Sequence, residues 1–287
     1  MLPRMVLLNI ENVDGLVAPI VIAALDGWVD AGAAATTAAG HLAAGGATVA
    51  TFDDDRLYDY RARRPTLDIV DGRPTTLSWP ELVARRARVG ERDVVVLTGP
   101  EPDFHWRELA IAAVELAQRL GVAEWISLGA IPAAVPHTRG VPILGTESAP
   151  GLLRADVAAG PDGILRVPAA AISVLDHAVA RAGIPAVGYF AQVPHYVTGA
   201  YVPAALELLR VVSRHLGHDV APGPLRDESR QVLARLDAAT AADDGTRAYV
   251  ERLELTVDEA RRPSGDDLIS EIEQFLRESG PEGGRNI

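Results

Sequence analysis

The sequence contains no cysteine and no lysine, and each absence excludes a class of chemistry. Without cysteine, a disulfide framework, a thiolate metal site and a cysteine nucleophile are impossible. Without lysine, Schiff-base catalysis and the phosphate-binding lysine of a P-loop are impossible as well. All 27 basic residues are arginines, and 39 acidic residues bring the net charge to −12. Nucleic acids and anionic membranes require a basic surface, so we expect neither as a partner.

Long hydrophobic runs are also missing. The longest, residues 16–25, is far shorter than the roughly 20 residues of a membrane-spanning helix. Residues 1–15 interrupt their apolar stretch with Asn9 and Glu11 and have no small-residue cleavage pattern, so no export signal is expected. We therefore expect a cytoplasmic protein. The lysine-free, Ala- and Arg-rich composition indicates a bacterial genome of high GC content.

Apolar residues make up 48% of the chain, enough for a full core, and they follow an alternating pattern. Short β-rich runs predict strands at 19–25, 47–52, 92–99, 123–131, 141–146 and 184–193. Helices are expected between them, at about 30–44, 80–89, 106–120, 172–182 and 202–217. Strands followed by helices predict a three-layer α/β/α sandwich with a largely parallel sheet. An insertion around residues 55–79 contains the turn "VDGR", which predicts a β-hairpin arm, either a lid over a site or an oligomer contact.

The strand pattern stops after the two prolines of "HLGHDVAPGPL", residues 215–225. We therefore expect an α/β domain over residues 1–220 and a helical C-terminal appendage over 221–287. The last predicted helix begins at Ser264, with Asp267 completing a capping-box-like start. Its apolar stripe consists of Leu268, Ile269, Ile272, Phe275 and Leu276. That stripe has to pack against its own chain or against a partner, and we favour Tyr249, Leu253 and Val257 of the same chain.

Polar residues follow several of the predicted strands, where α/β proteins place their ligands. Asp26 and Trp28 end one strand, and Asp30 is expected to cap the next helix through N–H groups two or three residues on. The spacing of the glycines there is not that of a dinucleotide fingerprint. We predict one pocket at this edge, lined by Asp26, Trp28, Glu101, Arg139, Glu147, His195 and Tyr196. An interface would suit His195 and Tyr196 equally well.

Two histidine-containing pairs resemble metal-ligand spacings. His105 and Glu108 lie three residues apart, as do His215 and His218. A protein zinc site needs at least three ligands, and neither pair has a third nearby, so we expect no metal and no cofactor. The first pair is interpreted as surface residues of a first helical turn. The second is interpreted as histidines favoured by the dipole at a helix end.

The candidates for nucleophilic catalysis are incomplete. Ser127 has Trp125 in place of the first glycine of G-x-S-x-G, which the tight nucleophile turn needs. Ser173, Asp176 and His177 fall on one predicted helix, whereas working triads come from distant segments. We therefore assign no catalytic residue.

Several segments, in order along nearly the whole chain, resemble one family. They are "GWVDAGAAAT", "TGPEPDFHW", "SLGAIPAAVPHTR", "VPILGTES", "VPHYVTGAYVPAALELL" and "PSGDDLISEIEQFL". The chain resembles the PAC2 family of proteasome-assembly-chaperone-like proteins. The resemblance implies a phosphorylase/hydrolase-like α/β fold, a homo-oligomer (most simply a trimer, then a dimer) and a proteasome-related or other protein partner.

Two functions remain open from the sequence. The first is an interaction or assembly factor, favoured by the small-residue helix after Asp30, the arm, and the amphipathic tail. The second is an enzyme of the phosphorylase/hydrolase-like class that acts on a small ligand in the crevice at the carboxyl ends of the strands. Fold kinship carries no catalytic residues across, so we expect binding in preference to catalysis. An ATP-dependent ligase is disfavoured by the absence of lysine.

Overall fold

The computed structural model describes residues 7–11, 13–154, 156–157, 159–160 and 163–260. Its centre is an eight-stranded mixed sheet with the order β1-β3-β6-β7-β2-β8-β10-β9. In that order the strands are Leu8–Ile10, Thr48–Phe52, Val83–Val89, Arg92–Pro100, Ile20–Asp26, Glu124–Ala133, Ala186–Pro194 and Ile143–Glu147. Strands β7, β2, β8 and β10 are parallel, and β6, β3, β1 and β9 add antiparallel pairings on both sides. We call the side of the sheet where the parallel strands end the carboxyl edge, and the side where they begin the amino edge.

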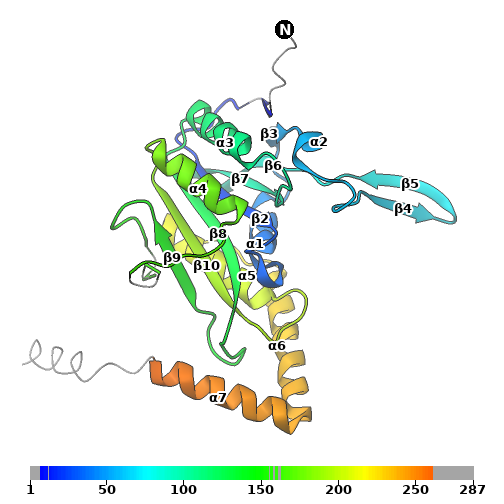
Figure 1. The fold of residues 1–287 in the computed structure, drawn as a ribbon, viewed down its shortest axis with the longest axis vertical. Helices are drawn as coiled ribbons and strands as arrows, with labels where there is room; N and C mark the ends of the chain where they lie inside the picture. Colours follow the sequence, from blue (N-terminus) through cyan, green and yellow to red (C-terminus); the bar gives the residue numbers. More distant parts are fainter. Residues whose placement is uncertain (1–6, 12, 155, 158, 161–162, 261–287) are drawn as a thin grey trace, which may run out of the picture. The chain divides into compact units, whose positions relative to one another are not determined.

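Helices cover both faces of this sheet (Figure 1). One layer holds α1 (Ala34–Ala43) and α5 (Val202–Leu216), and the other holds α3 (Trp106–Leu120) and α4 (Ala171–Arg181). Successive side chains of β2 point to opposite faces of the sheet, so Ile22 packs into the α1–α5 core and Val21 into the α3–α4 core. The prediction of an α/β/α sandwich is thereby confirmed.

A two-stranded hairpin projects from the sheet region, after the short helix α2 (Asp54–Leu57) (Figure 1). Its strands are β4 (Thr66–Val70) and β5 (Arg73–Ser78), paired antiparallel. Asp71 and Gly72 form the turn with φ angles of 51° and 75°. Two positive φ values match the twist of a tight hairpin, which explains the Asp-Gly sequence.

Up to residue 260, the C-terminal segment contains the predicted helices, α6 (Leu225–Ala242) and α7 (Asp244–Ala260). The chain forms two compact units, residues 1–238 and 239–287. The division at residue 220 stays a prediction. Tyr249, Leu253 and Val257 lie on α7, whereas the apolar stripe predicted to pack on them, Leu268 to Leu276, lies outside the described residues. No helix in the described part of the chain combines the length and apolarity that crossing a membrane requires.

Two expectations about the sheet were wrong. Residues 80–89, predicted as a helix, contain β6, and the sheet is mixed and not largely parallel. Alanine and arginine favour a helix locally, but β6 pairs along its whole length with β7, and Val83 and Val89 are buried. Pairing and burial therefore outweighed the local preference.

Candidate functional site

Three of the predicted pocket residues meet at the carboxyl edge. Strands β2 and β7 end side by side, and the Glu101 N–H donates to the Asp26 carbonyl at 2.8 Å. The Glu101 carboxylate accepts the N–H groups of Trp28 at 3.1 Å and of Ala171 at 2.6 Å. Glu101 thus joins the end of β2 to the start of α4. The side chain of Trp28 is 69% exposed above this junction.

Asp30 caps α1, but not through the N–H groups that were predicted. Its carboxylate accepts the N–H groups of Ala35 at 2.7 Å and Thr36 at 3.4 Å, and also the Thr36 hydroxyl. The donors are five and six residues on because Gly32 (φ 64°) and Ala33 (φ 49°) form a left-handed turn before α1. Burial raises the pKa of Asp30, and the hydrogen bonds from Thr36 and Ala35 oppose that shift.

His195 and Tyr196 follow β10 at the same edge. His195 Nδ1 donates to the Ala133 carbonyl at 2.9 Å. The Tyr196 hydroxyl lies 2.8 Å from both the N–H and Nδ1 of His137, whose Nε2 is 3.2 Å from Asp237 on α6. Tyr196 is therefore held by a chain of hydrogen bonds that ends on α6. Arg139 lies, partly exposed, on the loop between β8 and β9. That these residues share a pocket with Asp26 stays a prediction.

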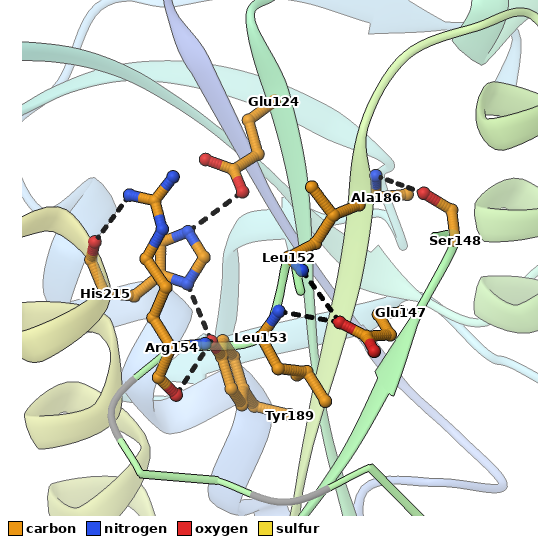
Figure 2. Close-up of polar contacts among 9 residues, drawn as sticks. All are labelled: Glu124, Glu147, Ser148, Leu152, Leu153, Arg154, Ala186, Tyr189 and His215. Atoms are coloured by element: carbon orange, nitrogen blue, oxygen red, sulfur yellow. Dashed lines mark hydrogen bonds and ion pairs between the residues drawn. The ribbon is translucent and has the colours of Figure 1, made fainter. Parts of the chain in front are cut away.

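Glu147 lies elsewhere, because β9 runs antiparallel to β10. Its partner in the register is Val187, near the start of β10, so Glu147 sits at the amino edge and not with the other predicted residues. Its carboxylate accepts the N–H groups of Leu152 and Leu153 at 2.8 and 2.9 Å (Figure 2). The Leu153 N–H above all holds the pKa of Glu147 below its ordinary value. Glu147 closes the loop that follows β9.

Sequence reasoning missed a buried polar network at the amino edge (Figure 2). His215 is 1% exposed, and its Nε2 lies 3.0 Å from Glu124 while its Nδ1 lies 2.6 Å from the Tyr189 hydroxyl. That hydroxyl also accepts the Arg154 N–H at 3.2 Å, and the Arg154 guanidinium donates to the His215 carbonyl at 3.2 Å. The helix-dipole interpretation does not describe this buried histidine. A glutamate at the start of an apolar strand was the available signal, since charges are rarely buried unpaired.

Glu124 is ionised in this network. Burial opposes its charge, but the hydrogen bond and charge of His215, helped by Arg154 and Arg92, hold the pKa of Glu124 below its ordinary value. Glu124, Arg92 and Arg154 also line a cavity of about 280 Å³ at the amino edge. The network satisfies its own polar groups and ties the loop after β9 to α5.

A second buried cluster joins two residues that the sequence analysis weighed separately. Asp176 on α4 accepts hydrogen bonds from the Ser127 hydroxyl and, at 3.1 Å, from Trp125 Nε1. Ser127 and Trp125 are fully buried on β8. Burial raises the pKa of Asp176 to about 7, against the hydrogen bonds from Ser127 and Trp125. His177, the next residue on α4, lines a cavity of about 440 Å³ together with Asp176.

The histidine pairs form no metal site among the residues described. His105 Nδ1 lies 2.9 Å from Glu108, which also pairs with Arg56, so this pair belongs to an exposed ion-pair cluster. Across the described ranges, no three His, Cys, Asp or Glu residues are placed to share a metal ion.

Comparisons with known proteins place this architecture in a family. The model of the PAC2 family matches residues 24–240. A Streptomyces avermitilis structure described as a PAC2 family protein is 34% identical, with 81% of this chain and 99% of that chain covered and a TM-score of 0.72. A Mycobacterium tuberculosis structure described as a proteasome-assembly chaperone homologue is 33% identical, with 80% and 99% covered and a TM-score of 0.73.

Another Mycobacterium tuberculosis structure, described as a protein of unknown function, is 32% identical, with 89% of this chain and 92% of that chain covered and a TM-score of 0.81. No functionally curated protein matches the sequence. The family model covers most of this chain, and the similar structures are covered almost completely. The chain belongs to the PAC2 family.

Proposed function

We propose that this chain is a chaperone-like assembly factor that works as a homo-oligomer and contacts other protein chains through its hairpin arm, residues 58–79. The class of function is supported by the 33% identical relative described as a proteasome-assembly chaperone homologue. The observation that carries the proposal is the uncovered apolar face of the arm.

Every residue of β4 and β5 is exposed, yet one face of the hairpin is apolar. Leu67 pairs directly with Leu77, and alternation along β4 puts Ile69 on the same face as Leu67. A register shift between these two positions places Ile69 opposite Pro74. Leu67, Ile69 and Leu77 are 47%, 62% and 52% exposed. At the base of the arm, Tyr60 and Trp79 pack edge to face at 4.7 Å. The base of the arm is thus closed by an aromatic contact, while the apolar face of the hairpin is exposed.

A two-stranded hairpin alone is marginally stable in water. Leaving three aliphatic side chains exposed to water makes the uncovered hairpin still less favourable. Covering the exposed halves of these side chains in an interface gains about 2–4 kcal/mol. The arm therefore has the composition of a contact element.

Charge supports a second copy of the chain as one occupant of this face. The arm carries four arginines and three aspartates, a net charge of +1, whereas the chain as a whole has a net charge of −12. An arm without excess negative charge is not repelled by the acidic body of another copy. We propose a trimer, as the phosphorylase-like fold suggests, with a dimer as the next choice. A proteasome-related protein is the proposed client of this assembly.

Light scattering of the purified full chain tests the proposal. The wild type is expected to have the mass of an oligomer at micromolar concentration. Ile69→Asp should lower that mass by charging the apolar face. Val70→Asp is the matched control, because Val70 is similarly exposed on the same strand but points to the other face. A monomeric wild type would refute the homo-oligomer, and an unchanged mass for Ile69→Asp would refute the role of the arm.

We propose no reaction at the carboxyl edge. Glu101 and Asp30 already accept hydrogen bonds from backbone N–H groups, and Glu147 lies at the other edge. A general acid or base needs a carboxylate that can reach its substrate. Asp26, at the same edge, is exposed, and the enzyme alternative stays a prediction.

A further inference from the structure

A cavity of about 440 Å³ lies between α4 and the antiparallel pair β9–β10, at the amino edge. It is separate from the arm and from the predicted pocket at the carboxyl edge. We call it the α4 cavity, and its lining consists of Thr146, Glu147, Ser148, Asp176, His177, Ala180, Arg181, Ala186 and Val187. Its volume lies within the range of small-molecule sites, about 300–1,000 Å³.

Asp176 presents one carboxylate oxygen to this cavity. The other oxygen, Oδ1, accepts both the Ser127 hydroxyl and Trp125 Nε1. Among the described residues, no hydrogen bond reaches Oδ2 of Asp176, and Oδ2 is not a buried atom without a partner, so it is open to the cavity. Ser127 and Trp125 fix the carboxyl from behind, so the unbonded oxygen has a defined position. A cationic group in the cavity can therefore reach this oxygen.

The remaining polar groups divide the cavity into two poles. Asp176 and Glu147 supply negative charge, whereas Arg181 and His177 supply cationic or protonatable groups. Asp176 and Arg181 are five residues apart on α4, so the two poles lie about 140° apart around the helix axis and about 7.5 Å apart along it. Ala180, Ala186 and Val187 form apolar wall, and Thr146 and Ser148 add hydroxyls.

We propose that the α4 cavity binds a small zwitterion of the free amino-acid class, with its ammonium group on Asp176 and its carboxylate on Arg181. A guanidinium is the side chain best suited to bind a carboxylate, because it offers two parallel N–H donors. The ammonium group supplies the charge that Asp176 lacks. The wall made by Ala180 and Val187 suits an aliphatic side chain such as that of leucine. This site goes beyond the proposed assembly function and does not depend on it.

We expect the binding of leucine to release protons. Burial raises the pKa of Asp176 to about 7, so the carboxyl is partly protonated near neutrality. An ammonium group favours the ionised form, and leucine should therefore release up to about half a proton per site at pH 7. Glu147 is held ionised by backbone N–H groups, and β8 and β10 contribute no ionisable side chain to the lining.

Titration calorimetry of the full chain tests the site with three probes that share one isobutyl group. Leucine carries both charged groups, 3-methylbutylamine carries only the amine, and 4-methylpentanoate carries only the carboxylate. Leucine is expected to bind at least about tenfold more tightly than either analogue, because each lost charged contact removes one of the two poles. Repeating the leucine titration in two buffers of different ionisation enthalpy measures the released protons.

Two variants locate the binding site. Asp176→Asn should weaken leucine about ten- to a hundredfold and abolish the proton release. Arg181→Gln should weaken leucine similarly but leave 3-methylbutylamine unchanged. Arg181 is exposed, so this variant should fold like the wild type. Asp68→Asn and Arg119→Gln, both exposed and outside the cavity, are the charge-matched controls.

The proposal is overturned if leucine gives no binding heat at millimolar concentration. It is also overturned if 3-methylbutylamine binds as tightly as leucine, which would make the cavity an amine site, or if 4-methylpentanoate does, which would make it an anion site. Leucine binding that neither variant weakens would place the site elsewhere. None of these outcomes bears on the oligomer mass that tests the assembly function.

Discussion

Replacing Asp176 by asparagine is expected to stabilise this protein, and to do so more strongly at pH 8 than at pH 5. Asparagine keeps an acceptor oxygen for Ser127 and Trp125 but never becomes charged. In the wild type, burial raises the pKa of Asp176 from 3.8 to about 7. A raised carboxyl pKa means that the folded state disfavours the charge. Stability is then lost as the pH rises from the unfolded pKa towards the folded one, and the penalty is complete above both.

The size of the effect follows from the two pKa values. At pH 5 the unfolded carboxyl is ionised and the folded one is not, which penalises the folded state by roughly one pKa unit. At pH 8 both are ionised, and the penalty is about three units. The difference of about two units corresponds to about 2.7 kcal/mol between pH 5 and pH 8. Asp176→Asn removes this penalty.

Urea unfolding followed by circular dichroism, at each pH unit from 5 to 8, measures the effect. Subtracting the wild-type free energy of unfolding from that of Asp176→Asn cancels the other titrating groups. Asp68→Asn, on the exposed arm, should show a difference that does not vary with pH. A constant difference for Asp176→Asn, or a variant less stable than the wild type at pH 8, would refute the reasoning.

Three further changes test other elements of the fold. His215→Leu leaves the buried Glu124 without its partner and should lower the free energy of unfolding by about 3–5 kcal/mol in urea at pH 7, whereas a loss below 1 kcal/mol would contradict the network. Ala33→Gly should raise stability by about 1 kcal/mol in thermal melts, because Ala33 has a φ of 49°, and a lower melting temperature would show that the turn is not strained. Asp30→Ala should cost about 1–2 kcal/mol and Asp30→Asn, which keeps an acceptor, clearly less, so equal losses in urea would argue against capping of α1.

The central strands and the main helices were predictable because their signals are local. The run "PIVIAAL" predicts a strand at 19–25 and β2 spans Ile20–Asp26, since a fully buried strand has to be continuously apolar. The helix predicted at 106–120 matches α3. The prediction of a helix at residues 80–89 was wrong for the opposite reason. Their local preference is helical, and only pairing with β7 makes Val83–Val89 a strand.

The candidate site was predictable only where neighbouring parallel strands end together. Asp26, Trp28 and Glu101 meet because β2 and β7 are parallel neighbours, a geometry that follows from the alternation of strands and helices. Glu147 could not be placed in this way. The five residues of β9 carry no signal that tells whether the strand runs parallel or antiparallel to β10. That direction decides at which edge the last residue of the strand lies.

Composition and local pattern determined what this protein excludes and what it is built from: no cysteine or lysine chemistry, an α/β core, and a hairpin that turns at Asp71 and Gly72. Tertiary structure alone decided which ionisable groups meet. His215 and Glu124 are 91 residues apart in the sequence, and Ser127 and Asp176 are 49 apart. Such contacts depend on strand order and register, which are set by packing over the whole sheet. No fixed spacing between residues in the sequence indicates them.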